Sequence, residues 1–200
     1  MARPPTTLRP PPKRALPQTE RPPLTVSRAE LLTDGTDREF RELVHAFFAF
    51  QGRHETLRDG HAAHVGLPGI QYTILIAIRH LEAEGDLSAK QLTDHLHCSS
   101  AFVAMETGKL VRAGLIVKER DPHDARRICL RTTPLTRVKL ATLAPVQRRV
   151  NDLEFAGLTR SDFKNLARII NSLITNCDAA IALQRHIEPG GSRDLEQNAA

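Results

Sequence analysis

The chain has 200 residues and a formal net charge of +5, as expected for a basic protein of one ordinary domain with extensions. Its hydrophobic content of 40% is enough for a core, whereas 4% aromatic residues and no Trp argue against base stacking on aromatic platforms. Three dispersed cysteines without a CxxC pair, no apolar signal region and no run of about 18 apolar residues predict a reduced cytoplasmic protein without a membrane span.

The N-terminal segment is rich in proline and basic residues. Residues 1–24 hold eight of the 13 prolines, so little of this segment can form a helix or be buried. We expect residues 1–35 to be a disordered basic arm, which either is inert or attracts DNA phosphates.

The first predicted helix begins at Thr36, which has the spacing of a capping box with Glu39. Its apolar residues recur at helical spacing: Phe40, Leu43, Val44 and Phe47. We expect this helix to end near Gly60 and a His-rich loop to continue to Pro68.

The next segments predict a helix–turn–helix. After a helix over 69–84, Ser88 and Gln91 have capping-box spacing for a short helix to about residue 96. A turn at 97–98 follows, and Ser99 or Ser100 caps a helix that runs to 113 and stops at Gly114. Two helices joined by a tight polar turn are a DNA-binding arrangement.

Two short strands are predicted next, over 115–118 and 128–131, with a charged hairpin tip between them. Pro134 then begins a helix that runs to about 155, and Thr159 or Ser161 caps the last helix. That helix carries an apolar stripe: Leu166, Ile170, Leu173 and Cys177. The predicted fold class is mainly α with a small β-hairpin wing.

Three sequence segments carry a family resemblance: 66–72 (GLPGIQY), 110–116 (LVRAGLI) and the hairpin tip 121–127 (DPHDARR). They resemble the MarR family of winged helix–turn–helix regulators, and the order of the flanking helices also matches. The resemblance implies a dimerisation helix with a His-rich loop at 36–65, a winged DNA-binding lobe at 66–132, C-terminal dimerisation helices at 133–186 and a flexible tail at 187–200.

The resemblance also implies the function: a homodimeric regulator that binds double-stranded DNA and acts as a repressor released by a small ligand. The expected DNA-binding residues are Ser88, Lys90, Ser99, Ser100, Ala101, Phe102, Ala104, Met105, Lys109, Arg112, Arg120, Asp124, Arg126 and Arg127. Arg126 is expected to enter the minor groove from the wing tip.

The recognition helix departs from the family where bases are read. Val103, Thr107 and Leu110 are expected to point inward, and Glu106 occupies a position that is usually apolar. Short hydrogen-bonding side chains are scarce on the outward face, so apolar contact with thymine methyl groups by Phe102 or Ala104 is one mode left open. Sequence preference would otherwise depend on the wing and on DNA shape.

Family members bind aromatic acids in a cleft between the dimer base and the lobe. The matching region offers these polar groups: Arg53, His54, His61, His64 and Tyr72. Other hypotheses remain open: an architectural DNA-binding protein without an effector, a metal-sensing regulator that uses the histidines, and a redox-sensing one that uses Cys98. We expect no catalytic residues, cofactor or bound metal, since no nucleophile–base set, paired carboxylates or phosphate-binding loop is present.

Overall fold

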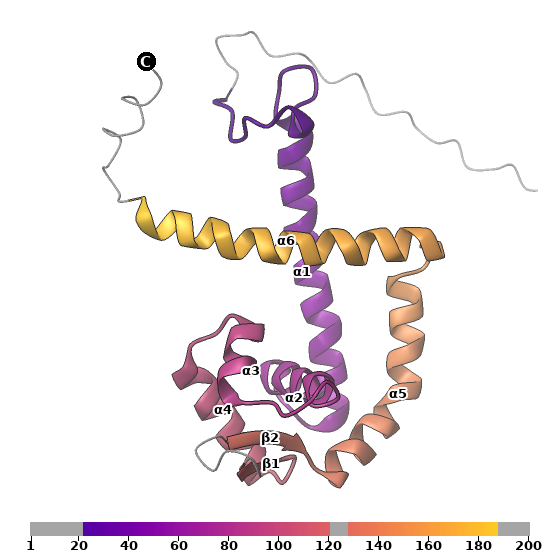
Figure 1. The fold of residues 1–200 in the computed structure, drawn as a ribbon. Helices are drawn as coiled ribbons and strands as arrows, with labels where there is room; N and C mark the ends of the chain where they lie inside the picture. Colours follow the sequence, from indigo (N-terminus) through magenta and orange to yellow (C-terminus); the bar gives the residue numbers. More distant parts are fainter. Residues whose placement is uncertain (1–21, 121–127, 188–200) are drawn as a thin grey trace, which may run out of the picture. The chain divides into compact units, whose positions relative to one another are not determined.

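The structure, a computed structural model, describes residues 22–120 and 128–187, and Figure 1 shows its elements. They are the 3-10 helix η2 (Ala29–Leu31), the helices α1 (Arg38–Val65), α2 (Gly69–Leu81), α3 (Ala89–Leu96) and α4 (Ser100–Arg112), the strands β1 (Ile116–Arg120) and β2 (Ile128–Thr132), and the helices α5 (Pro134–Glu154) and α6 (Arg160–His186). The predicted fold class, mainly α with one β-hairpin, is confirmed. The chain divides after Ala77 into two compact units.

The first unit opens with an ordered segment, residues 22–37, which we call the N-terminal strap. The backbone N and Oγ1 of Thr25 both donate to Oδ2 of Asp37 at 2.7 Å, and Nε of Arg41 donates to the same oxygen at 3.0 Å. Asp37 is only 4% exposed. The hydrogen bonds from Thr25, aided by Arg41, lower the pKa of Asp37 to about 2, although burial opposes this shift. The expectation of disorder is therefore wrong for residues 22–35.

The start of α1 also differs from the prediction. Asp37, not Thr36, is the N-cap residue, and its side chain caps no helix N–H because it accepts from Thr25 instead. Thr36 donates to the carbonyl of Thr33, and Oε2 of Glu39 accepts from Oγ1 of Thr33 at 2.8 Å. The capping box that the sequence spacing predicted is thus replaced by contacts with the strap.

The end of α1 lies later than predicted, because the expected His-rich loop is helical as far as Val65. Gly60 is tolerated inside the helix, since His61, Ala62 and Val65 are buried there. The helix ends at Gly66, whose φ of 76° is a left-handed conformation that favours glycine. Gly69 opens α2 against the side chain of Asp59, so close that a Cβ would lie 1.8 Å from Oδ1.

The second unit holds a winged lobe built around one core. Its fully buried apolar side chains come from α2, α3, α4 and both strands, and they include Ile78, Leu92, Val103, Leu110, Ile116 and Leu130. α3 contacts α4, α4 contacts β1, and α3 contacts β2, and Figure 1 shows the hairpin lying beside these two helices. The strands pair antiparallel, with Ile116 opposite Thr132 and Arg120 opposite Ile128.

Two further helices follow the hairpin. Oγ1 of Thr133 accepts from the N–H of Thr136 and caps α5, whose first residue is Pro134, as predicted. α6 begins with a capping box between Thr159 and Asp162, so the predicted cap at Thr159 is also confirmed. The last residues expected to be flexible, 188–200, lie outside the described residues.

None of the described residues of α6 is buried in the single chain. By length and composition alone, α6 is long and apolar enough to cross a membrane. Asn171, Asn176 and Asp178 interrupt the apolar residues of α6, so it is not the continuous run of about 18 apolar residues that the sequence was predicted to lack. The apolar side chains nevertheless gather on one face, around Leu166 and Leu173, while Arg168 and Ser172 lie on the other.

Candidate DNA-binding surface

The helix–turn–helix consists of α3, the turn at His97–Cys98 and α4. Ser88 and Gln91 form the predicted capping box at the start of α3, with the N–H of Ser88 donating to Oε1 of Gln91 at 2.8 Å. His97 ends α3 in the left-handed conformation, with a φ of 50°. Oγ of Ser99 then accepts from the N–H of Phe102 at 3.2 Å and caps α4. Side-chain caps therefore define the start of both helices, and the left-handed backbone of His97 ends α3.

α4 buries one face and exposes the opposite one. Val103, Thr107 and Leu110 point into the core, as predicted, and Glu106 is buried with them. Four residues at the spacing i, i+4, i+7 and i+11 form an outward line that we call the α4 stripe: Ala101, Met105, Gly108 and Arg112. Ala104 is exposed on one side of the stripe, and Phe102 and Lys109 are half-buried on the other.

Glu106 is a site feature whose partner the sequence analysis missed. Its side chain is buried, and Oε1 accepts from Nζ of Lys109 at 2.7 Å. The signal was present, because an acidic and a basic residue three positions apart share a helix face. This ion pair holds the ammonium group of Lys109 at the edge of the α4 stripe.

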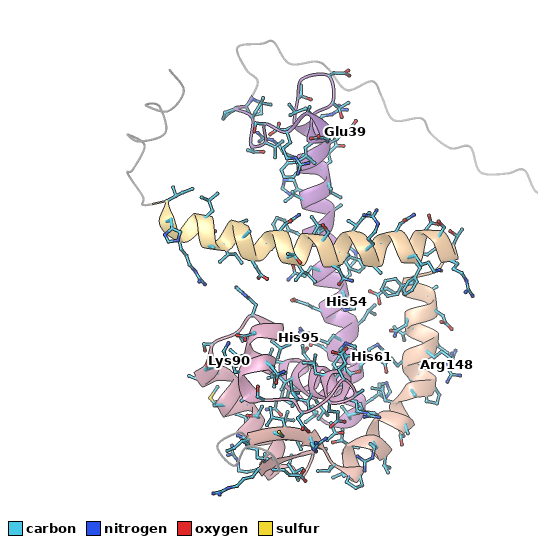
Figure 2. All side chains as sticks on the ribbon, viewed as in Figure 1. Glu39, His54, His61, Lys90, His95 and Arg148 are labelled. Atoms are coloured by element: carbon cyan, nitrogen blue, oxygen red, sulfur yellow. The ribbon has the colours of Figure 1, made fainter. Side chains whose placement is uncertain are left out.

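The remaining predicted cations and hydroxyls lie around the two helices. Lys90 is exposed on α3 (labelled in Figure 2), and its ammonium group lies 2.7 Å from Oδ2 of Asp94. Ser100 is exposed at the first position of α4. Arg120 is exposed where β1 ends. The other wing-tip residues predicted to bind DNA, Asp124, Arg126 and Arg127, lie outside the described residues.

The base of the wing is fastened to the end of α2 by Glu82. Oε2 of Glu82 accepts from the backbone N–H of Thr132 at 2.7 Å, Oε1 accepts from the hydroxyl of Thr132, and Nη1 of Arg79 donates to Oε1 at 2.9 Å. Burial alone would raise the pKa of Glu82, but the hydrogen bonds from Thr132 and Arg79 outweigh it and lower the pKa. We call this set the Glu82 brace.

Arg131 makes a second connection within the same lobe. Its guanidinium group pairs with Asp86, which precedes α3, and lies 3.4 Å from Oε2 of Glu119 on β1. The N–H of Leu130 also donates to the carbonyl of Leu87 at 2.8 Å. Together with the Glu82 brace, these bonds hold the hairpin in a set position relative to the helix–turn–helix.

The comparisons with known proteins agree with this geometry. Residues 65–127 match the family model described as "MarR family". Of the matched residues, those that the structure describes include the helix–turn–helix and β1. Among curated proteins, none matches the chain.

The MarR fold also appears among solved structures. The chain is similar to MarR from Oenococcus oeni PSU-1 (16% identity, 66% of this chain and 98% of that one, TM-score 0.56). It is similar to a mutant MarR from E. coli solved with operator DNA (15% identity, 68% and 95%, TM-score 0.56). A third similar structure is BpsR of Bordetella bronchiseptica, whose DNA binding is regulated by 6-hydroxynicotinic acid (19% identity, 64% and 90%, TM-score 0.52).

The five residues expected to hold an effector all lie in the first unit, and the structure brings only some of them together. His61 and Tyr72 are buried, with ring centroids 6.4 Å apart. Arg53 is exposed and donates to the carbonyl of Ala49. His54 and His64 are exposed as well, and Figure 2 labels His54 and His61 on α1.

An open hollow of about 450 Å³ lies elsewhere, at the α5–α6 corner. It is lined by Phe155, Leu158, Thr159, Arg160, Phe163 and Lys164. Within the described residues, no group of three His, Cys, Asp or Glu side chains could hold a metal ion. Cys98, Cys129 and Cys177 form no disulfide in the described residues.

Proposed function

We propose that the chain is a homodimeric, sequence-specific transcription regulator, and that it acts as a repressor released by a small aromatic acid. The observation that carries the proposal is the braced winged lobe. A capped helix–turn–helix presents the outward face of α4, and two sets of polar bonds hold the wing in place beside it. This arrangement suits a lobe that inserts one helix into the major groove while its wing contacts the flanking DNA.

The exposed apolar faces of α1 and α6 support the homodimer. Phe47 and Phe48 are exposed on α1, Phe48 by 64%, and Leu173 and Ile174 are exposed on α6. Apolar patches of this kind mark interaction surfaces in soluble proteins. A second copy would bury the same faces on both chains around a two-fold axis, and two lobes would then reach two half-sites.

The proposed effector is a small aromatic acid, and the support comes from a similar protein. BpsR, which shares the fold, is regulated by 6-hydroxynicotinic acid. In the present chain, we propose that such a ligand binds in the region of α1 and α2 that carries Arg53, His54, His61, His64 and Tyr72, of which His61 and Tyr72 lie together. Release from DNA requires only that the ligand bind more tightly to the conformation that does not fit the operator.

Three measurements on the purified chain test the proposal. Light scattering should give a dimer. Binding to duplexes selected from a random library should be at least about 10³-fold tighter than binding to bulk DNA, as for sequence-specific regulators. An aromatic-acid panel should contain a compound that raises the melting temperature and weakens DNA binding. Equal affinity for selected duplexes and for bulk DNA would instead favour an architectural DNA-binding protein.

The wing tip supplies a prediction of its own. We expect Arg126→Ala to weaken binding to selected DNA by about 1–3 kcal/mol, because a guanidinium group suits the negative potential of a narrow minor groove. The melting temperature should stay within the error of wild type, since exposed charges contribute little to stability. Wild-type affinity in this variant at matched salt would remove Arg126 from the binding mechanism.

A further inference from the structure

The outward face of α4 has an unusual chemical composition for a helix that reads bases. The α4 stripe begins with a methyl group at Ala101, continues with the thioether of Met105, which is 52% exposed, and reaches the bare backbone of Gly108. Ala104 and Phe102 flank it with further apolar groups. Over its first two turns, the stripe therefore contains no hydrogen-bond donor, and its only side-chain acceptor is the weak one of the Met105 sulfur.

Apart from Ser100, which is exposed at the first position of α4 and off the stripe, the polar side chains near the middle of α4 are engaged elsewhere. Oγ of Ser99 caps the helix, and Oγ1 of Thr107 donates to the carbonyl of Ala104 at 3.1 Å inside the lobe. Lys109 is paired with the buried Glu106 at 2.7 Å. Arg112 comes at the C-terminal end of the stripe, and its Nη1 lies 3.6 Å from where a Cβ at Gly108 would be. The central part of the stripe is thus left to apolar contacts.

The major groove offers one apolar group on its base edges, the C5-methyl of thymine, which 5-methylcytosine also carries. We propose that α4 reads C5-methylated pyrimidines in the major groove, with Met105 as the specificity-determining side chain. The inference rests on the proposed function, because it requires α4 to enter the groove. The flexible thioether can fill the space around a methyl group, and Gly108 lets the backbone of α4 approach the DNA closely.

The test begins with duplexes that the purified chain selects from a random-sequence library. In each selected duplex, deoxyuridine replaces thymidine at one position at a time, which removes only the methyl group and keeps both hydrogen-bonding edges. We expect at least one position in each half-site where the replacement weakens wild-type binding about fourfold, the equivalent of about 0.8 kcal/mol for one buried methyl. The same replacement in the flanking sequence serves as the DNA control.

Protein variants assign the contact. Met105→Ala should bind thymine and uracil duplexes equally at the position read by Met105. Val111→Ala, which shortens an exposed apolar side chain off the stripe on the same helix, should keep the wild-type discrimination. Replacing the sensitive thymine by cytosine and then by 5-methylcytosine tells the two methyl sources apart. If the affinity lost with cytosine returns with 5-methylcytosine, α4 reads the methyl group on either base. If it does not return, methyl reading by α4 is restricted to thymine.

The outcomes separate the inference from the proposed function. Tight binding to selected duplexes with no effect of deoxyuridine at any position would overturn the inference and leave the regulator proposal standing. Unchanged discrimination in Met105→Ala would overturn the role of Met105. If the library yields no duplex that binds more tightly than bulk DNA, the proposed function fails, and the inference fails with it.

Discussion

Gly108 weakens α4 on the face that we propose binds DNA. It lies in the middle of the helix, where glycine costs about 1 kcal/mol relative to alanine. Its backbone is not in the left-handed region, and an added Cβ would meet only the end of Arg112, at 3.6 Å. Nothing in the fold of the single chain therefore requires glycine at this position.

We predict that Gly108→Ala raises the stability of the fold and weakens DNA binding. The free energy of unfolding should rise by about 0.5–1 kcal/mol, because the unfolded chain loses flexibility. Affinity for selected duplexes should fall, because the new methyl group stands between the α4 backbone and the groove. Denaturant unfolding and titration of labelled duplexes measure the two effects, and unchanged affinity would show that α4 does not approach DNA at Gly108.

Residues whose partners are close in sequence were predictable, and those with distant partners were not. Ser88, Ser99 and Thr159 cap helices through N–H groups three residues ahead, so the spacing alone revealed them. The hydrogen bonds of Asp37 were not predicted, because its partner, Thr25, is 12 residues away in a segment whose prolines favoured disorder. The hydrogen bonds of Glu82 were not predicted either, because Thr132 lies 50 residues further along the chain.

At the scale of elements, the Glu82 brace determines how firmly the hairpin is attached to α2. We predict that Glu82→Gln destabilises the lobe by about 1–3 kcal/mol at pH 7, because the neutral amide makes weaker bonds with Thr132 and Arg79. Glu84→Gln is the matched control, since Glu84 is exposed and lies 3.7 Å from Nε2 of His80. Chemical unfolding of both variants beside wild type gives the two values.

The Glu82 brace also predicts a pH dependence. The pKa of Glu82 in the folded lobe is lowered from an ordinary value of 4.5, so the carboxylate stabilises the fold fully above that value. This stability is lost as the pH falls below 4.5 and through the folded pKa. The difference between wild type and Glu82→Gln should therefore shrink between about pH 5 and pH 3. A difference that stays constant over this range would show that the bonds of the ionised carboxylate are not its source.

The N-terminal strap predicts where the chain can be shortened. Its hydrogen bonds begin at Pro23 and Thr25, so deleting residues 1–21 should leave the melting temperature unchanged. Deleting residues 1–25 should lower it, because Asp37 loses both donors of Thr25. If residues 1–21 contact DNA phosphates, the shorter deletion should also make DNA binding less sensitive to salt. The slope of the logarithm of the binding constant against the logarithm of the salt concentration should then shrink by about one per lost contact.

The lengths of elements were harder to predict than their order. From the sequence, the first helix was predicted to end near Gly60 and to be followed by a His-rich loop to Pro68. α1 continues through this region because the buried positions His61 and Val65 lie on one helix face, and contacts with α2 decide the outcome. Local propensity is a weak guide where tertiary packing supplies the stability.

At the scale of the whole molecule, the second copy is the proposed partner for the apolar faces that the single chain leaves exposed. α6 has the length and composition of a membrane span, but its apolar residues lie on one side, and Asp178 and Arg168 would be costly in lipid. A helix that is apolar on one face and polar on the other suits packing against protein. The hollow at the α5–α6 corner adds apolar surface from Phe155 and Phe163 that a second chain could cover.

We therefore predict that Leu173→Asp converts a dimer into a monomer. Leu173 lies in the middle of the apolar face of α6, where an unpaired carboxylate in the interface should cost several kcal/mol, on the order of 3–5. Ser172→Asp is the matched control, because it adds the same charge one residue earlier on the polar face. Light scattering at micromolar concentration should give twice the chain mass of 22.2 kDa for wild type and the control, and a single chain mass for Leu173→Asp. A monomeric wild type would show that the apolar face of α6 serves another partner, and a dimeric Leu173→Asp would move the interface away from this residue.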